Sequence, residues 1–160
     1  MVKKEKKVEK KIVNKTKEPE FYRAVGRRKQ SNARIRLYPV GSKIKFGEME
    51  LKDGEIMINK RTVENYFPGP SFEKLYLEPF RTTNTVGRFT VTAIVAGGGQ
   101  MGQLEAFIHG VSRALVKVDE EKFRPILRKR GFMTRDPRAK ERRKAGNAQK
   151  ARAKKQSPKR

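Results

Sequence analysis

Most large apolar residues of this chain lie in its middle, and this limits what it can fold into. Residues 1–20 are a run rich in Lys and Glu, and residues 146–160 consist mainly of Ala, Lys, Arg and Gln. Segments without large apolar side chains cannot bury enough surface to offset the entropy of ordering them. We therefore expect one folded domain over 21–123, a disordered extension over 1–20 (or a short fraying helix there), and a basic extension over 124–160 with short helices and an extended tail.

Charge is the second constraint. The chain has 41 Lys and Arg residues against 17 Asp and Glu residues, a net charge of +24, and residues 124–160 alone hold 16 basic and 2 acidic side chains. A chain this basic repels itself and seeks a polyanion, which predicts a nucleic-acid partner. No apolar segment is long enough to span a bilayer, so no membrane partner is expected.

The composition also argues against several kinds of chemistry. The chain has no Cys and a single His, His109, which excludes disulfides, Cys nucleophiles and metal sites built from Cys or several His residues. The N-terminus lacks the apolar stretch of a secretory signal. We therefore expect a cytoplasmic protein with no metal and no cofactor.

Apolar periodicity predicts a mixed sheet packed with helices, an α+β fold. Alternating or continuous apolar residues predict strands at 21–25, 33–38, 55–58 and 89–95 and a small hairpin within 41–52. Thr62 is expected to cap a short helix that ends before Pro68, and Ser71 to cap another over 72–77 that ends before Pro79.

A longer helix is predicted after the strand at 89–95. Its apolar stripe consists of Leu104, Phe107, Ile108, Val111 and Leu115, and the opposite face carries Glu105, His109 and Arg113. Two further short helices are predicted in the basic extension. One covers 126–130 with Gly131 as its C-cap, and the other covers 137–144 with Asp136 as its N-cap.

A glycine-rich segment, Gly97-Gly98-Gly99-Gln100-Met101-Gly102, joins the strand at 89–95 to this helix. It satisfies the G-x-G-x-x-G pattern of dinucleotide-binding turns. Such a site also needs a second strand that ends in an acidic residue, whereas Asp119-Glu120-Glu121 follows the helix directly. Two interpretations stay open: a tight turn that packs closely, or helix amides that bind an RNA phosphate. A catalytic His needs a nucleophile or a substrate pocket beside it, and the sequence shows no such arrangement around His109, so we expect no enzymatic activity.

Basic residues carry the functional interpretation. Gly26-Arg27-Arg28-Lys29-Gln30-Ser31 places three cations in a predicted turn, and Arg34 and Arg36 share one face of the next strand. Phosphate contacts require charges projected from a rigid surface, so these residues are predicted to bind RNA rather than to form a solvated face alone. The tail beyond Gly146 is predicted to order on folded RNA, with strongly salt-dependent binding.

Several stretches together resemble one known family. They are Gly26-Arg27-Arg28-Lys29-Gln30-Ser31-Asn32-Ala33-Arg34, Ile58-Asn59 with Glu64-Asn65-Tyr66-Phe67, the glycine segment 97–103 with His109-Gly110-Val111-Ser112-Arg113-Ala114-Leu115, Gly131-Phe132-Met133-Thr134-Arg135-Asp136, and Lys150-Ala151-Arg152 with a terminal Lys159-Arg160. In combination they resemble the universal small-subunit ribosomal protein number nine in its bacterial form, over residues 21–160.

The resemblance implies a fold, a place and partners. The fold would be related to the second domain of ribosomal protein five, with a left-handed βαβ crossover. The place would be the head of the small ribosomal subunit, on 16S ribosomal RNA and beside other head proteins. The C-terminal tail would reach the peptidyl site and contact the bound transfer RNA there.

Candidate contact residues follow from the basic surface and the resemblance. Ribosomal RNA contacts are expected at Arg27, Arg28, Lys29, Arg34, Arg36, Gly98, Gly99, Gln103, His109, Arg113, Arg128, Lys129, Arg130, Arg135, Arg138, Lys140, Arg142, Arg143, Lys144, Lys150 and Arg152. Transfer RNA contacts are expected at Lys155, Ser157, Lys159 and Arg160.

Three features depart from the family pattern. They are the extension at 1–20, the hairpin inserted within 41–52, and a tail tip that reads Gln156-Ser157-Pro158-Lys159-Arg160 where an aromatic residue usually precedes the serine. The two cations at the tip are kept, and Pro158 restricts the backbone just before them. Two alternatives from other classes also stay open: a free nucleic-acid-compacting protein, and a nucleotide-dependent enzyme built on the glycine turn.

Overall fold

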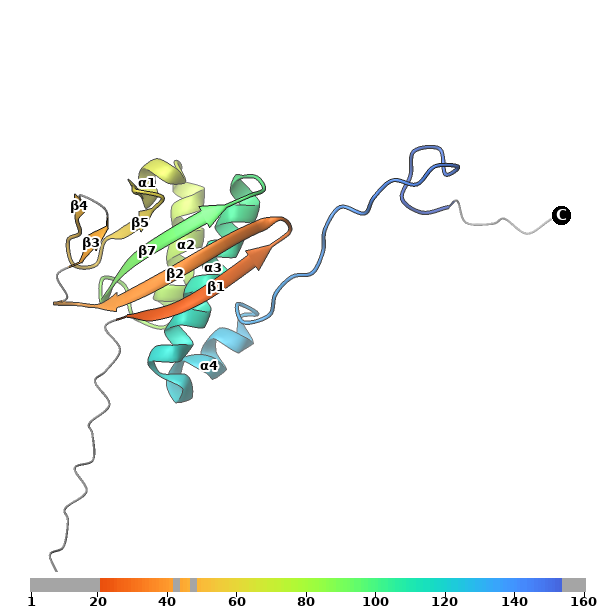
Figure 1. The fold of residues 1–160 in the computed structure, drawn as a ribbon. Helices are drawn as coiled ribbons and strands as arrows, with labels where there is room; N and C mark the ends of the chain where they lie inside the picture. Colours follow the sequence, from red (N-terminus) through yellow and green to blue (C-terminus); the bar gives the residue numbers. More distant parts are fainter. Residues whose placement is uncertain (1–20, 42–43, 47–48, 154–160) are drawn as a thin grey trace, which may run out of the picture.

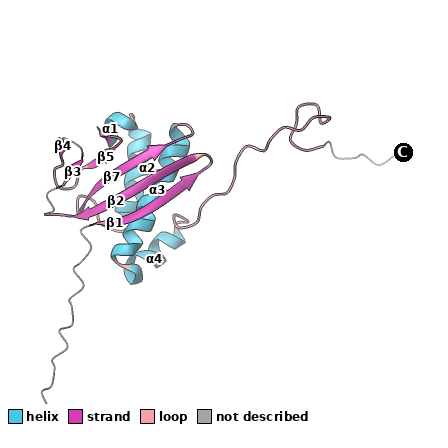
Figure 2. Cartoon of the chain, viewed as in Figure 1, coloured by secondary structure: helices cyan, strands magenta, loops and turns pink. Residues whose placement is uncertain are grey.

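The computed structural model describes residues 21–41, 44–46 and 49–153. Five strands form one mixed sheet in the order β1-β2-β7-β5-β6, with helices packed against one face (Figures 1 and 2). The strands are β1 (Tyr22–Arg28), β2 (Ser31–Pro39), β5 (Ile56–Ile58), β6 (Arg61–Thr62) and β7 (Phe89–Ala96). The α+β fold predicted from periodicity is confirmed.

The sheet is antiparallel except where β5 runs parallel to β7. That parallel pair is joined by a crossover that contains β6, α1 (Val63–Tyr66) and α2 (Pro70–Thr82). The handedness of this crossover stays an expectation from the resemblance. Strand β6 was not predicted; it pairs with β5 through a two-residue turn at Asn59 and Lys60, both with positive φ, as tight hairpins require.

Helix α3 (Gln100–Val118) covers the inner face of β1 and β2 (Figure 1). Its predicted apolar stripe is confirmed, because Leu104, Phe107, Val111 and Leu115 are fully buried and Ile108 is partly buried against the core. The helix comes unusually close to the sheet. A Cβ atom on Gly26 would overlap the carbonyl oxygen of Ala106, and one on Gly110 would lie 2.6 Å from the Ile35 side chain.

The predicted bounds of α2 were wrong at both ends. The helix begins at Pro70, with Gly69 rather than Ser71 at the N-cap, and continues through Pro79 to Thr82. Proline suits the first helical position because its missing N–H has no partner there. The helix continues past Pro79 because Tyr76 and Phe80 are buried in the core, which outweighs one lost hydrogen bond. Thr62 precedes α1 as predicted but makes no side-chain cap hydrogen bond.

The helix predicted at 126–130 is longer in the structure. Helix α4 (Glu120–Lys129) starts where the Asp119 carboxylate accepts a hydrogen bond from the Lys122 amide (3.1 Å). The predicted stop at Gly131 is confirmed: Gly131 has φ 79°, and the Phe132 amide donates to the Leu127 carbonyl at 3.1 Å. Leu127 is fully buried, so the packed body continues past residue 123.

The helix predicted at 137–144 is not formed; residues 135–144 are irregular. The Asp136 carboxylate does accept from the Arg138 amide (2.9 Å), as an N-cap would. Residues 137–144 are exposed and contain five cations and no large apolar side chain, so the segment has no apolar face to pack on the body and no packing to stabilise a helix.

The hairpin predicted within 41–52 is confirmed by the antiparallel pair β3 (Lys45–Phe46) and β4 (Met49–Glu50). It lies near the start of β7 (Figure 1), where the Gly54 amide donates to the Thr90 hydroxyl at 3.1 Å. Met57, Thr90 and Thr92 are buried although the α helices pack on the other face of the sheet.

Candidate nucleic-acid interface

The outer face of the sheet, opposite α3, is basic. Arg34 and Arg36 are exposed on β2 while Ala33, Ile35 and Leu37 are buried, so the predicted alternation is confirmed. The register places Arg36 directly opposite Arg23 of β1. These arginines have the exposure that phosphate contacts require.

The predicted cationic turn is shorter than expected. Arg27 and Arg28 belong to β1, and only Lys29 and Gln30 form the turn, with Lys29 at φ 51°. Because neighbouring strand residues point to opposite faces, Arg27 is exposed and Arg28 is buried. This division was not predicted, because arginine is rarely buried unless it is paired.

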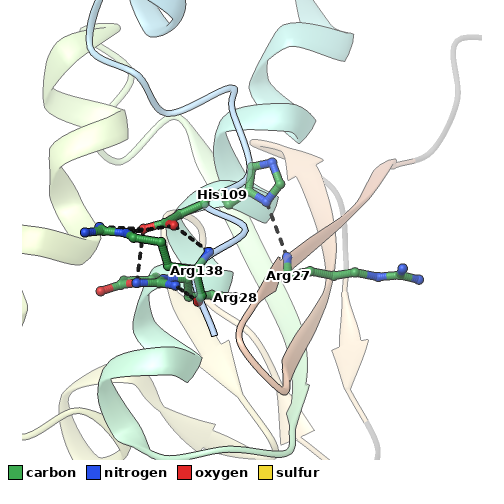
Figure 3. A network of polar contacts seen from close by, with 6 residues as sticks. Arg27, Arg28, His109 and Arg138 are labelled. Atoms are coloured by element: carbon green, nitrogen blue, oxygen red, sulfur yellow. Dashed lines mark hydrogen bonds and ion pairs between the residues drawn. The ribbon is translucent and has the colours of Figure 1, made fainter. Parts of the chain in front are cut away.

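Arg28 binds residues that lie far along the chain (Figure 3). Its guanidinium is ion-paired with Glu105 of α3 and with Asp136 (Nη2–Oδ2 3.1 Å), and it donates to the Arg138 carbonyl. Its side chain is only 9% exposed. The planar, five-donor guanidinium suits such convergent acceptors. We call Arg28, Glu105, Asp136 and Arg138 the tail clamp, because they hold the start of the irregular segment on the body.

Asp136 has a second partner in Arg138, whose guanidinium contacts both carboxylate oxygens (2.7 to 3.1 Å). These hydrogen bonds and the charges of Arg138 and Arg28 hold the pKa of the Asp136 carboxyl well below its usual range. Asp136 therefore stays ionised at every physiological pH, and the tail clamp keeps its charge.

Three side chains of α3 cap the free edge of β1. The His109 Nδ1 atom accepts from the Arg27 amide (3.3 Å), and Arg113 and Lys117 donate to the Val25 and Arg23 carbonyls (2.7 and 2.9 Å). Four helical residues advance about 6 Å and two strand residues about 6.6 Å, so the two spacings match. The open backbone of an edge strand is thereby blocked.

His109 is half-buried, and burial followed by the charge of Arg113 lowers the pKa of its imidazole. The lowered pKa agrees with the geometry, because only a neutral imidazole can accept the Arg27 amide at Nδ1. His109 therefore acts in this structure as a hydrogen-bond acceptor for the edge of β1.

The glycine segment packs on the turn between β1 and β2. Gly97 and Gly98 have positive φ, and a Cβ atom on Gly97 would lie 2.6 Å from the Gln30 carbonyl oxygen. The Ser31 hydroxyl donates to the Gly97 carbonyl at 2.9 Å. The tight-turn interpretation is therefore confirmed, and the RNA-phosphate interpretation stays a prediction.

Gln103 completes a network behind this turn. Its amide nitrogen donates to the Gly97 carbonyl (3.2 Å), and its amide oxygen accepts from the Tyr66 hydroxyl (2.8 Å). Asn59 extends the network to the Tyr66 hydroxyl and to both backbone groups of Val95. Asn59 and Tyr66 were not singled out as site residues, although an Asn at a turn position was a signal for a left-handed conformation.

The first turn of α3 is open to solvent. Gly99 is the N-cap without a side-chain cap, a Cβ atom there would meet nothing within 4 Å, and Gln100 and Met101 are exposed. Amides in a first helical turn have no acceptor within the helix, so this end of α3 keeps the polarity that favours an anion.

The C-terminal segment presents most of the remaining predicted contacts. Its exposed cations include Arg128, Lys129, Arg130, Arg135, Lys140, Arg142, Arg143, Lys144 and Lys150. Arg152 is ion-paired with Glu141 (2.6 Å), and the Lys144 amide donates to the Lys150 carbonyl (3.2 Å), so the intervening chain forms a loop. The predicted contacts Lys155, Ser157, Lys159 and Arg160 lie outside the described residues, as does the extension 1–20.

Residues 26–160 match the family model described as ribosomal protein S9/S16. The match covers most of the chain, from the strand that carries Arg28 to the C-terminal end. The chain belongs to the ribosomal protein S9/S16 family. It is accordingly a small-subunit ribosomal protein that binds ribosomal RNA, has other ribosomal proteins as partners and serves translation within a ribonucleoprotein.

S9/S16 proteins are structural rather than enzymatic, and the topology contradicts the dinucleotide-binding alternative. Helix α4 follows α3 directly, and Asp119 caps it instead of ending a strand. Among the described residues, no three His, Asp or Glu side chains are arranged to hold a metal ion. No described helix combines the length and apolarity needed to cross a membrane.

Proposed function

We propose that this S9/S16 protein docks its body on 16S ribosomal RNA in the head of the small subunit of a bacterial-type ribosome in the cytoplasm, and that its tail contacts transfer RNA in the peptidyl site. The observation that carries the proposal is the tail clamp. It fixes Asp136 and Arg138, at the start of the irregular segment, against the folded body. These two residues belong to the stretch 124–160, which holds 16 basic and 2 acidic residues.

The mechanism is electrostatic. Each Lys or Arg that neutralises a phosphate releases counterions, so the many cations of the tail supply affinity without reading sequence. The tail orders when it enters folded RNA. The clamp lowers the entropic cost of this step, because the first residues of the tail are already held in place when the body docks.

The contacts within the protein divide the predicted RNA residues into two groups. Ribosomal RNA is assigned to the exposed cations other than Arg113 and to the amides of Gly98 and Gly99. Arg130, Arg138 and Arg152 are included, although each also pairs with a carboxylate of the protein. Arg28, Gln103, His109 and Arg113 are positioning residues, because their polar atoms bind the protein's own carboxylates, side chains or backbone. Lys155, Ser157, Lys159 and Arg160 are assigned to the transfer RNA.

Reconstituted small subunits that contain the chain truncated before Gly146 test this assignment. We expect normal co-sedimentation of the truncated protein with the subunit, because the body and the clamp are intact, but weaker binding of peptidyl-site transfer RNA. Full-length protein with Lys159→Gln and Arg160→Gln is the control for the tip alone, with an intermediate loss expected. Unchanged transfer RNA affinity in both would contradict the tail contact. Recovery of the protein mainly with the nucleoid would favour a free nucleic-acid-compacting protein instead.

A further inference from the structure

A groove runs over the outer face of β1, β2 and β7, the face that the α helices leave uncovered. Its lining combines three exposed arginines, Arg23, Arg34 and Arg36, with the apolar side chains of Val25 and Ile94 and the ring of Phe46. Phe46 comes from the β3–β4 hairpin, so this hairpin contributes to the surface. None of the lining residues is acidic.

The strand register explains how the two kinds of side chain alternate. Val25, Arg34 and Ile94 form one cross-strand row, and Arg23, Arg36 and Thr92 form the next. Ile94 is 45% exposed, a large apolar surface for a central strand. The groove therefore presents two apolar side chains, Val25 and Ile94, on either side of Arg34, with the Arg23–Arg36 pair in the next row and the Phe46 ring in the same lining.

The charge of the three groove arginines is not compensated within the described part of the chain. Arg23 lies directly opposite Arg36, and like charges in such a pair repel. No ion pair or side-chain hydrogen bond joins Arg23, Arg34 or Arg36 to any other described residue. The Arg36 guanidinium lies 5.4 Å from the centre of the Phe21 ring, which orients it but does not neutralise it. An anionic group is the missing partner.

We propose that this groove binds an unpaired nucleotide of RNA. The arginines take the phosphates, and the base lies against the apolar side chains of the groove, Ile94 and Phe46. A duplex would present only phosphates to this surface, whereas a splayed-out base supplies the flat apolar partner that Ile94 and Phe46 require. The inference rests on the proposed function and adds to it the conformation of the RNA bound here.

The first test compares a short single-stranded oligoribonucleotide with a duplex of equal phosphate number, each bound to the full chain. Ile94→Thr keeps a β-branched residue on the strand and removes apolar surface, and Phe46→Ala removes the ring. Both are expected to weaken single-strand binding several-fold and to leave duplex binding and the salt slope unchanged. Equal weakening for both RNAs, or none, would overturn the proposal.

Matched cation variants distinguish RNA binding in this groove from nonspecific electrostatic attraction between RNA and the basic protein. Arg34→Gln is expected to reduce the salt slope for the single strand by about 0.7, the value for one released phosphate contact. Arg61→Gln, an exposed cation on the far edge of the sheet, is expected to have a smaller effect on it. Identical effects of the two variants would contradict a specific groove. Unchanged chemical-denaturation curves verify that each variant remains folded.

The second test uses the protein in assembled small subunits, with Phe46 replaced by the photo-crosslinking analogue p-benzoylphenylalanine. We expect a crosslink to one unpaired ribosomal RNA nucleotide. A crosslink to a neighbouring protein, to paired nucleotides only, or to nothing would overturn the groove assignment while co-sedimentation with the subunit still upholds the proposed function. Failure of the protein to enter the subunit would overturn both.

Discussion

The guanidinium of Arg28, at the end of β1, is ion-paired with the carboxylate of Asp136, at the start of the C-terminal segment (3.1 Å). The same guanidinium holds Glu105 and the Arg138 carbonyl. One buried side chain therefore joins the first hairpin of the sheet, the helix packed on it and the root of the tail. This makes Arg28 a structural residue, whereas most of the other cations that the structure describes face solvent.

Replacing Arg28 by Lys tests the tail clamp. Lysine keeps the charge but cannot reach three acceptors in the plane of a guanidinium, so at least one charge-assisted hydrogen bond is lost. We expect the free energy of unfolding in urea to fall by about 1.5–3 kcal/mol. Limited proteolysis near Arg135 and Arg138 is also expected to become faster. Arg27→Lys, on the exposed neighbour, is the control, and equal losses in both variants would contradict the clamp.

The pKa of His109 predicts a pH dependence of stability. The folded-state pKa lies below the ordinary value of 6.5, so between the two pKa values the unfolded chain binds more protons than the folded chain. The contribution of neutral His109 to the free energy of unfolding is therefore fully present above pH 6.5 and decreases as the pH falls below 6.5. Urea unfolding of the wild type on both sides of pH 6.5 measures this decrease. His109→Gln can still accept from Arg27 but does not titrate, so the variant is expected to lose this part of the dependence.

The contact between α3 and β1 predicts a sharp difference between two glycines. A Cβ atom on Gly26 has no space beside the Ala106 carbonyl, and both are backbone-anchored. Gly26→Ala is therefore expected to lower the free energy of unfolding by about 3 kcal/mol or more, at the upper end of overpacking effects. Gly99→Ser, at the open N-cap of α3, is expected to be neutral or slightly stabilising. Thermal melting compares them, and similar stability losses would contradict the packing.

Periodicity was sufficient to predict the central elements. The strand around Ile35 and the helix through Phe107 bury one face each, and the strand around Val91 is buried on both faces from Thr90 to Ala93. An alternating, helical or continuous apolar pattern is the local signal for each of these cases. The errors lie where packing outweighs a local signal. Pro79 suggested the end of α2, and Asp136 suggested a new helix. Helix α2 continues past Pro79 because Phe80 is buried in the core, and no helix follows Asp136 because that segment has no apolar face to pack on the body.

The basic surface was predictable in part. Strand alternation was enough to place Arg34 and Arg36 outward, since the period of two is local. The partners of Arg28, His109 and Arg113 are not local: they lie 77 to 110 residues away in the sequence for Arg28, and 82 and 88 away for the other two. A single sequence does not reveal which distant carboxylate or backbone group a cation will meet, so these residues looked the same as the solvent-facing ones.

The contact between the tail and the peptidyl-site transfer RNA is the central claim, and a crosslink from the tail tip tests it most directly. A photo-crosslinking group at Ser157, in small subunits that carry messenger RNA and peptidyl-site transfer RNA, reports what lies within reach of the tip. We expect a crosslink to the anticodon stem-loop of that transfer RNA, lost when the peptidyl site is empty. Crosslinks confined to ribosomal RNA or protein, and unchanged by the transfer RNA, would contradict the account.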